Sequence, residues 1–211
     1  MEDLRYFIWI ISMKNTVLYI HGKNGSADEA EIYKPVFSEY EVIGLDYKAE
    51  TSWQAKAEFP KLFDELCAGG DEVILIANSI GAYFAMHSLA EKKINKAYFI
   101  SPIVDMERLI LDMMKWAGVG ENELAKRGEI KTDFGETLSW EYLCYIREHQ
   151  IKWQIPTEIL YSDNDGFTSL ETITAFAERT GAGLTVMPDG EHWFHTEEQM
   201  RFLTEWLTER K

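Results

Sequence analysis

The sequence has 211 residues and a formal charge of −15, from 36 acidic and 21 basic side chains. This acidic excess argues against binding to nucleic acid or to an anionic membrane surface, because both need an excess of Lys and Arg. Hydrophobic residues make up 46% of the chain, too many for a disordered protein. The length predicts a single domain, 1–211, with a full hydrophobic core.

The two cysteines, Cys67 and Cys144, are too few for a disulfide framework or a Cys-based zinc site. We therefore expect reduced thiols in a cytoplasmic protein. The apolar run at residues 6–13 is short for a membrane span and lacks the basic flank of a signal peptide. We interpret it as an edge strand or an extension, with Met13 as an alternative start.

Along the first hundred residues, short β-branched runs alternate with helical patterns. The patterns predict strands at 16–20, 42–45, 73–77 and 97–100, and helices at 26–37, 53–66 and 80–90. Ser26 and Glu29 have the spacing of a capping box for the first helix. The run at 73–77 is apolar throughout, which is typical of a strand covered on both faces.

The alternation stops after the fourth strand. Residues 102–156 hold no convincing strand, but they hold helical patterns at 103–114 and 138–151. This segment is much longer than a parallel crossover requires, so we interpret about 102–155 as an inserted helical cap.

Strands at 159–161 and 184–187 then resume the pattern, with helices at about 168–181 and after residue 196. Thr168 with Glu171, and Thr196 with Gln199, have the spacing of capping boxes. The whole pattern predicts an α/β protein whose mostly parallel, six-stranded sheet has helices on both faces. Ligands of such sheets bind beyond the carboxyl ends of the strands.

A serine follows the third strand. Ser79 stands in Ala77-Asn78-Ser79-Ile80-Gly81, between that strand and a helix. Small residues two before and two after a serine at this place are typical of a nucleophile elbow. The alternative is that Ser79 only caps the helix.

The first strand ends in a glycine-containing loop, His21-Gly22-Lys23-Asn24. Acyl transfer needs two N–H donors for its oxyanion, and we expect them at Ile80 and at Lys23 or Asn24. The loop does not have the spacing of a phosphate-binding P-loop. His21 is interpreted as structural.

An acid and a histidine follow the last two strands. Asp165 precedes a glycine that lets its loop bend, which favours it over Asp163, and His192 lies in a loop, which favours it over His195. The order Ser79, Asp165, His192 is that of a catalytic triad in which histidine is the base and the carboxylate orients it. Asp165 could instead be a turn residue.

Asp105 and His195 also have alternative roles in the sequence. Asp105 is a further conceivable acid, but it is better placed as a helix N-cap. The pattern His192-x-x-His195 lacks a third ligand, so we expect no metal and no cofactor.

These motifs together resemble the α/β-hydrolases, in the group of esterases, lipases and serine hydrolases. The resemblance starts at about residue 16 and covers the rest of the chain. It implies the strand order second, first, third, fourth, fifth, sixth, and a lid after the fourth strand. The sequence departs from the family at Ala77 and Asn78, where Gly and often His stand, and it lacks clear early antiparallel strands.

The aromatic residues of the inserted segment suggest a wall for an acyl or aromatic group, with Trp116, Trp140 and Tyr145 as substrate contacts. They could equally pack the cap onto the core. We expect a serine hydrolase of neutral carboxylic esters or thioesters. The alternatives are a non-catalytic binding protein of the same fold and a nucleotide-binding doubly wound domain, which the loop after the first strand fits poorly.

Overall fold

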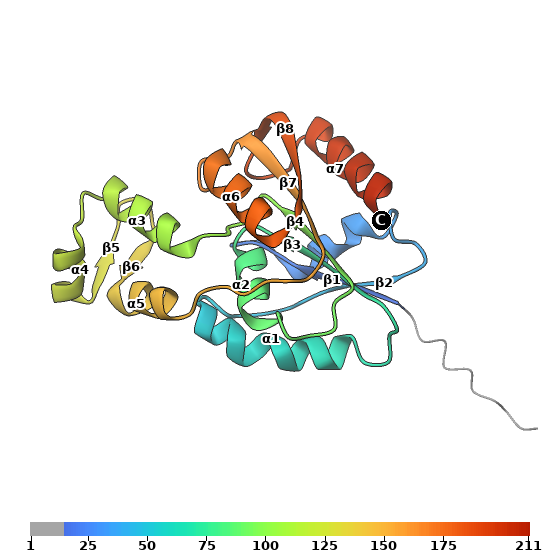
Figure 1. The fold of residues 1–211 in the computed structure, drawn as a ribbon, viewed down its shortest axis with the longest axis horizontal. Helices are drawn as coiled ribbons and strands as arrows, with labels where there is room; N and C mark the ends of the chain where they lie inside the picture. Colours follow the sequence, from blue (N-terminus) through green and yellow to red (C-terminus); the bar gives the residue numbers. More distant parts are fainter. Residues whose placement is uncertain (1–14) are drawn as a thin grey trace, which may run out of the picture.

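The computed structural model describes residues 15–211, and its centre is one parallel six-stranded sheet (Figure 1). The strand order is β2-β1-β3-β4-β7-β8, and every neighbouring pair is parallel. This confirms the fold class and the strand order that the sequence predicted. The strands are β1 (Thr16–Ile20), β2 (Glu41–Gly44), β3 (Val73–Asn78), β4 (Lys96–Ile100), β7 (Thr157–Asn164) and β8 (Gly183–Glu191).

Helices cover both faces of this sheet. Because side chains alternate along a strand, Leu18 and Ile20 enter one core while Val17 and Tyr19 enter the other. The first core is closed by α1 (Ser52–Leu66), α2 (Ile80–Ser88) and α6 (Leu170–Thr180), and the second by the 3-10 helix η1 (Ala27–Tyr33) and α7 (Glu197–Arg210). The central strands β1, β3 and β4 lie between the two cores and are buried on both faces.

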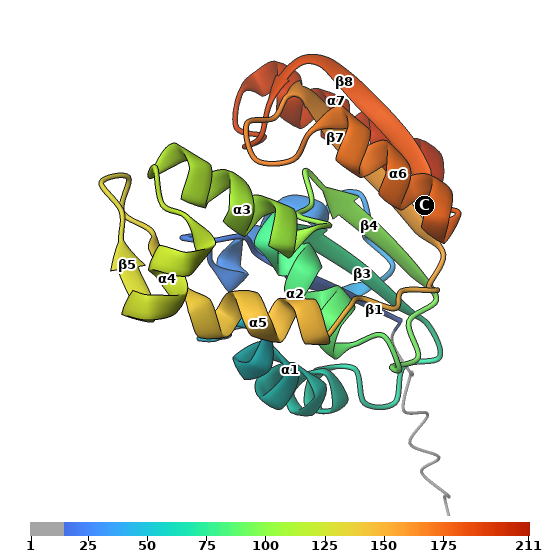
Figure 2. The same cartoon turned by 60° about the vertical axis from the view of Figure 1, so that its left-hand side comes forward.

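The segment between β4 and β7, here called the insertion, extends from one end of the sheet (Figures 1 and 2). It holds α3 (Met106–Trp116), α4 (Glu121–Arg127), β5 (Glu129–Lys131), β6 (Thr137–Ser139) and α5 (Trp140–Glu148). The expectation of no strand here was wrong, because β5 and β6 form an antiparallel hairpin in which Ile130 pairs with Leu138. Each strand has three residues with a single buried side chain, too few for a period-2 pattern to stand out.

Several helix ends also differ from expectation. The sequence placed the cap of α6 at Thr168, whereas Ser169 caps it by accepting a hydrogen bond from the Thr172 amide. Thr168 is instead buried, and its hydroxyl donates to the Pro102 carbonyl at 3.2 Å. The capping boxes of η1 and α7 are present as predicted.

The last strand is longer than expected. Strand β8 continues through Pro188 to Glu191, and β7 reaches Asn164, with an irregular register between Ser162 and Asn164. Proline is tolerated in β8 because it is an edge strand. The lengthened strands end directly before Asp165 and His192.

The predictions about residues 6–13 and Met13 lie outside the described residues. Within residues 15–211, no helix combines the length and the apolar character that a membrane crossing requires.

Candidate active site

Ser79 occupies a strained turn between β3 and α2. Its φ of 49° and ψ of −122° lie in a region that residues other than glycine rarely adopt. Three backbone hydrogen bonds hold the turn. The Ser79 amide donates to Ile100 at 3.0 Å, and its carbonyl accepts from Ala82 at 3.2 Å and Ile103 at 3.1 Å. The end of β4 and the residues after it therefore brace the conformation of Ser79.

Small residues around Ser79 are a steric requirement. A Cβ on Gly81 would lie 2.3 Å from the His21 carbonyl oxygen, so no larger residue fits without a backbone shift. A Cβ on Gly22 would lie 3.2 Å from the Cβ of Ser79. Ala77 is fully buried at the end of β3. The close packing of the β1 and β3 ends explains the small flanks that the sequence motif contains.

A continuous hydrogen-bond chain links Ser79, His192 and Asp165. The Ser79 hydroxyl lies 2.8 Å from His192 Nε2, and His192 Nδ1 lies 2.6 Å from Asp165 Oδ2. The Asp165 side chain is fully buried and that of His192 is 18% exposed. A buried carboxylate next to Nδ1 fixes the proton there, which leaves Nε2 free to accept the serine proton.

The loop after β7 holds Asp165 in place through its other oxygen. Asp165 Oδ1 accepts hydrogen bonds from the amides of Phe167 at 2.7 Å and Thr168 at 3.1 Å. The ring of Phe167 also meets the His192 imidazole edge-on, with 4.8 Å between ring centroids. Sequence reasoning missed this aromatic contact. The only local signal was an aspartate two residues ahead of Phe167, at the spacing of an Asx-turn.

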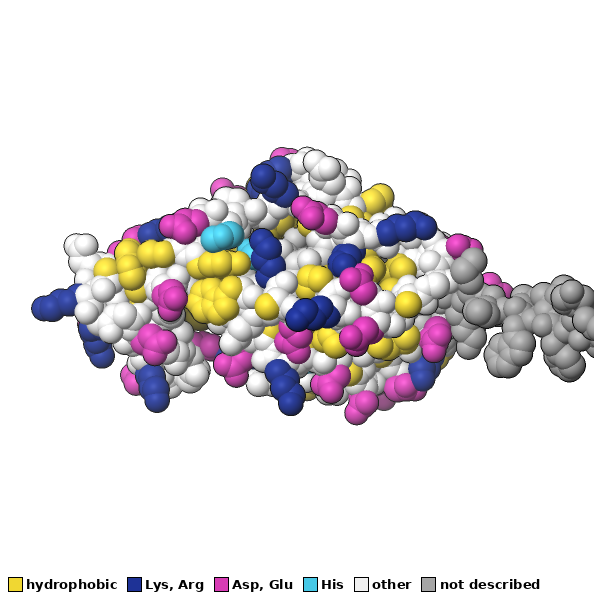
Figure 3. All heavy atoms as spheres, turned by 90° about the horizontal axis from the view of Figure 1, so that it is seen from below, with side chains coloured by type: hydrophobic (Ala, Val, Ile, Leu, Met, Phe, Trp, Pro, Cys, Tyr) yellow, Lys and Arg dark blue, Asp and Glu magenta, His cyan; other side chains and the backbone are white. Residues whose placement is uncertain are grey.

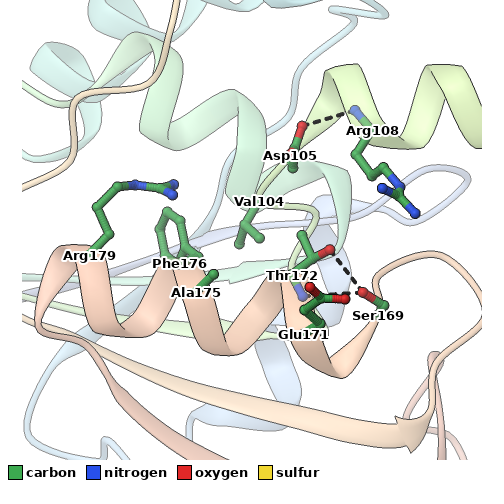
Figure 4. Close-up of a pocket in the computed structure, with 9 residues that line it drawn as sticks. All are labelled: Val104, Asp105, Arg108, Ser169, Glu171, Thr172, Ala175, Phe176 and Arg179. Atoms are coloured by element: carbon green, nitrogen blue, oxygen red, sulfur yellow. Dashed lines mark hydrogen bonds between the residues drawn. The ribbon is translucent and has the colours of Figure 1, made fainter.

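The other acids and the other histidine that the sequence offered take no part in this series of hydrogen bonds. Asp163 is exposed. The Nδ1 atom of His195 lies 2.8 Å from the Trp193 carbonyl, and its ring stacks on that indole. Asp105 caps α3 by accepting from the Arg108 amide at 2.9 Å. Asp105 lines a cavity of about 220 Å³ between the start of α3 and α6, and none of Ser79, Asp165 and His192 lines that cavity (Figure 4).

Three backbone amides close to Ser79 have free N–H groups. Within residues 15–211, the amides of Ile80, Lys23 and Asn24 donate to no protein acceptor. Ile80 is the first residue of α2, where the helix dipole favours negative charge. Lys23 and Asn24 lie in the loop after β1, and Gly22 of that loop is packed against Ser79. The free N–H groups of these amides are compatible with the role expected of them from the sequence.

His21 occupies a structural position at the end of β1. Its ring stacks on Tyr47 with 4.2 Å between centroids, and the Tyr47 hydroxyl donates to the His21 carbonyl at 2.8 Å.

The three aromatic residues expected to contact substrate lie apart from one another. Trp116 is 53% exposed and touches Phe134 at the tip of the hairpin. Trp140 is half-buried and packs on the first core, while Tyr145 stacks on His149. Among the described residues, the ring that meets His192 is that of Phe167, and none of these three rings pairs with it. Their positions fit the packing of the insertion at least as well as contact with a substrate.

Residues 15–211 hold no metal cluster, and one face of the molecule carries charges of both signs. No group of three or more His, Cys, Asp or Glu side chains within residues 15–211 could hold a metal ion. On the face shown in Figure 3, basic side chains alternate with acidic ones and form no continuous basic patch.

Burial raises the pKa of the Cys67 thiol to about 12, so this cysteine stays protonated at neutral pH.

Comparisons with known proteins reveal the same fold in solved structures. No family model matches the sequence, and no curated protein matches it. Est1E from Butyrivibrio proteoclasticus has a TM-score of 0.73 at 18% identity, over 93% of this chain and 86% of that one. The mouse α/β hydrolase domain-containing protein 10 has a TM-score of 0.71 at 15% identity, over 92% and 88%. An esterase domain from a Rhodothermus marinus protein has a TM-score of 0.63 at 14% identity, over 94% and 86%. The chain therefore has the α/β-hydrolase fold.

Proposed function

We propose that this chain is a serine hydrolase that cleaves small, neutral carboxylic esters or thioesters through an acyl-enzyme. The observation that carries the proposal is the uninterrupted hydrogen-bond chain from Ser79 through His192 to Asp165, with links of 2.8 and 2.6 Å. A serine hydroxyl is a weak nucleophile at neutral pH, and a histidine within hydrogen-bond reach is the group that activates it.

The first half of the reaction forms the acyl-enzyme. Ser79 Oγ attacks the acyl carbon while His192 Nε2 takes the hydroxyl proton, and Asp165 stabilises the resulting imidazolium. The oxyanion of the tetrahedral intermediate accepts hydrogen bonds from the amides of Ile80 and of Lys23 or Asn24. The intermediate then collapses, and His192 gives its proton to the departing alcohol or thiol.

The second half releases the acid. His192 removes a proton from water, and the water oxygen attacks the acyl carbon bound to Ser79. The same amides receive the oxyanion, the bond to Ser79 Oγ breaks, and His192 returns the proton to the serine. No cofactor enters either half-reaction.

Two observations support an uncharged substrate. The chain carries a net charge of −15, which disfavours approach by anions. The Phe167 ring lies against His192 and is 51% exposed, so it offers an apolar surface beside the proposed base. The solved structure named as an esterase domain adds the expectation of ester cleavage.

A p-nitrophenyl ester series from acetate to palmitate tests this proposal, together with an acyl thioester measured by thiol release. Wild type should hydrolyse at least one member, and Ser79→Ala should lose on the order of a thousandfold or more in kcat. A preference for longer chains would support substrate contacts with Trp116, Trp140 or Tyr145. Inactivity of wild type across the whole series would contradict the proposal and favour a binding protein of the same fold.

A further inference from the structure

A buried tyrosine lies between the two segments that carry the free amides. Tyr19 is the last but one residue of β1 and is fully buried. Its hydroxyl accepts a hydrogen bond from the Asn78 side-chain amide at 3.0 Å and donates one to Glu29 Oε2 at 2.5 Å. Asn78 directly precedes Ser79, so one end of this chain of contacts is at the turn that holds the serine.

The other end of the chain is at the loop after β1. Glu29 Oε1 accepts from the Ser26 amide at 3.2 Å. A Cβ on Gly25 would lie 2.8 Å from the same oxygen, so the loop backbone packs directly against the carboxylate. Lys23 and Asn24 lie between Gly22, which touches Ser79, and this contact with Glu29.

We propose that Tyr19 and Glu29 are positioning residues that fix the distance between the two halves of the oxyanion hole. The links from Asn78 to Tyr19, from Tyr19 to Glu29 and from Glu29 to Ser26 cross-connect the Ser79 turn, which carries the Ile80 amide, to the loop that carries Lys23 and Asn24. An oxyanion accepts from both donors only where both lie within hydrogen-bond distance of one point. This inference rests on the proposed hydrolase function.

The protonation state of Tyr19 suits this role. Burial, then the neighbouring Tyr33, and then the hydrogen bond to Glu29 raise the pKa of the Tyr19 phenol well above its usual range. The phenol therefore stays protonated and donates to Glu29 at neutral pH. The Asn78 side-chain amide, which donates to this phenol, is turned toward the protein interior.

Tyr19→Phe tests the inference, because it keeps the ring and removes the hydroxyl that joins Asn78 to Glu29. Tyr33→Phe is the matched control. Tyr33 is also buried, and its ring centroid lies 5.1 Å from that of Tyr19. Its hydroxyl lies near the Asn78 side chain but makes no hydrogen bond to Glu29 within the described residues. Both variants lose one phenolic oxygen beside Asn78, but only Tyr19→Phe loses the connection from Asn78 to Glu29.

We expect Tyr19→Phe to lower kcat for a p-nitrophenyl ester by about 10-fold to 100-fold, because small misplacements of donors have effects of this size. KM should stay within about threefold, since the donors act mainly on the transition state. Phenylboronic acid, which forms a tetrahedral adduct with a reactive serine, should lose affinity by a similar factor. Tyr33→Phe should keep wild-type values of all three.

Glu29→Gln is the second variant and carries the test if Tyr19→Phe does not fold. The single amide oxygen of glutamine can accept from Tyr19 or from Ser26, but not from both through separate atoms, so an intermediate loss of kcat is expected. Unchanged kcat and boronate affinity in Tyr19→Phe and Glu29→Gln would overturn this inference alone, and so would equal losses in Tyr19→Phe and Tyr33→Phe. Wild type without any turnover would overturn the proposed function and this inference with it.

Discussion

The strand ends that carry Ser79, Asp165 and His192 and the insertion between β4 and β7 are held in different ways. At the strand ends, buried side chains and backbone amides make short hydrogen bonds to one another, and glycines allow backbones to meet at contact distance. The insertion adds buried apolar side chains to the first core, but its polar contacts with the rest of the chain include a partly exposed ion pair, Lys23 with Glu136 at 2.5 Å.

This difference separates two kinds of tolerance to substitution. A buried hydrogen-bonded group leaves its partner unsatisfied when it is removed, and a backbone in contact cannot accept a Cβ. A partly exposed ion pair contributes little, because water and salt replace it. Substitutions at the strand ends should therefore abolish activity, whereas substitutions at the exposed polar contacts of the insertion should change stability or substrate range by small amounts.

Asp165→Asn should have the largest effect of the substitutions compared here. An amide at this position cannot act as the carboxylate that orients His192 and stabilises its imidazolium, so kcat should fall by about 10³-fold to 10⁴-fold at neutral pH. Asp163→Asn is the control, because Asp163 is exposed and lies two residues earlier. Steady-state kinetics with the best ester of the series measure both. Comparable losses in the two variants would contradict the assignment of Asp165.

Gly81→Ala should have the next largest effect. The added Cβ would lie 2.3 Å from the His21 carbonyl oxygen, so the start of α2 and the end of β1 must move apart. We expect a stability loss of about 1 to 3 kcal/mol and a fall in kcat of about 100-fold. Gly120→Ala, with φ of −91° and open space around the added Cβ, should cost under about 1 kcal/mol and leave kcat unchanged. Urea denaturation and kinetics check both variants, and a fully active Gly81→Ala would refute the packing argument.

His87 should make the contact between α2 and α5 dependent on pH. Its ring lies 5.5 Å from that of Tyr145, and burial, then Lys56 and His149, lower the pKa of His87 to about 4. A histidine with a lowered folded-state pKa binds fewer protons than in the unfolded chain between about pH 4 and its ordinary pKa of about 6.5. The free energy of unfolding should therefore fall as pH drops through this window. Above the window His87 is neutral in both the folded and the unfolded chain, so it causes no loss of stability there.

Urea denaturation at pH 7.5, 6.0 and 5.0 measures this slope. His87→Gln should flatten it over this range, where most carboxylates are still ionised. A slope as steep in His87→Gln as in wild type would assign the effect to other groups.

The ion pair of Lys23 with Glu136 should have the smallest effect. The two side chains are 56% and 38% exposed, so a double-mutant cycle of Lys23→Gln and Glu136→Gln should give a coupling of about 0.2 to 1 kcal/mol. This coupling should vanish in about 1 M salt, where the Debye length is about 3 Å. A coupling of several kcal/mol that persists in salt would mean that the insertion is held as firmly as the strand ends.

The same contrast separates what the sequence could predict from what it could not. The continuous apolar run of β3 and the helix pattern after Ser79 were long enough to fix element types, and the strand order followed from family resemblance. The predicted sheet is confirmed, and His192 lies within hydrogen-bond distance of both Ser79 and Asp165 because parallel strands end at a common edge.

The insertion was harder to predict. The three-residue strands β5 and β6 are too short for a periodic pattern. Aromatic residues there were read as substrate contacts from composition alone, whereas the neighbours of each ring depend on how α3, α5 and the hairpin pack. The ring of Phe167 contacts His192, and the hydroxyl of Tyr19 joins Asn78 to Glu29. Each of these contacts joins side chains from separate elements, so the spacing of residues along the sequence does not predict it.

The central claim is that Ser79 is the activated nucleophile, and covalent labelling tests it most directly. Wild-type protein is incubated with a fluorophosphonate probe, and the adduct is located by mass spectrometry of the peptides, with Ser79→Ala and His192→Ala in parallel. The account predicts one adduct per chain, on Ser79, which is absent from Ser79→Ala and forms much more slowly in His192→Ala. Absence of labelling in wild type, or equal labelling of Ser79→Ala, would contradict it.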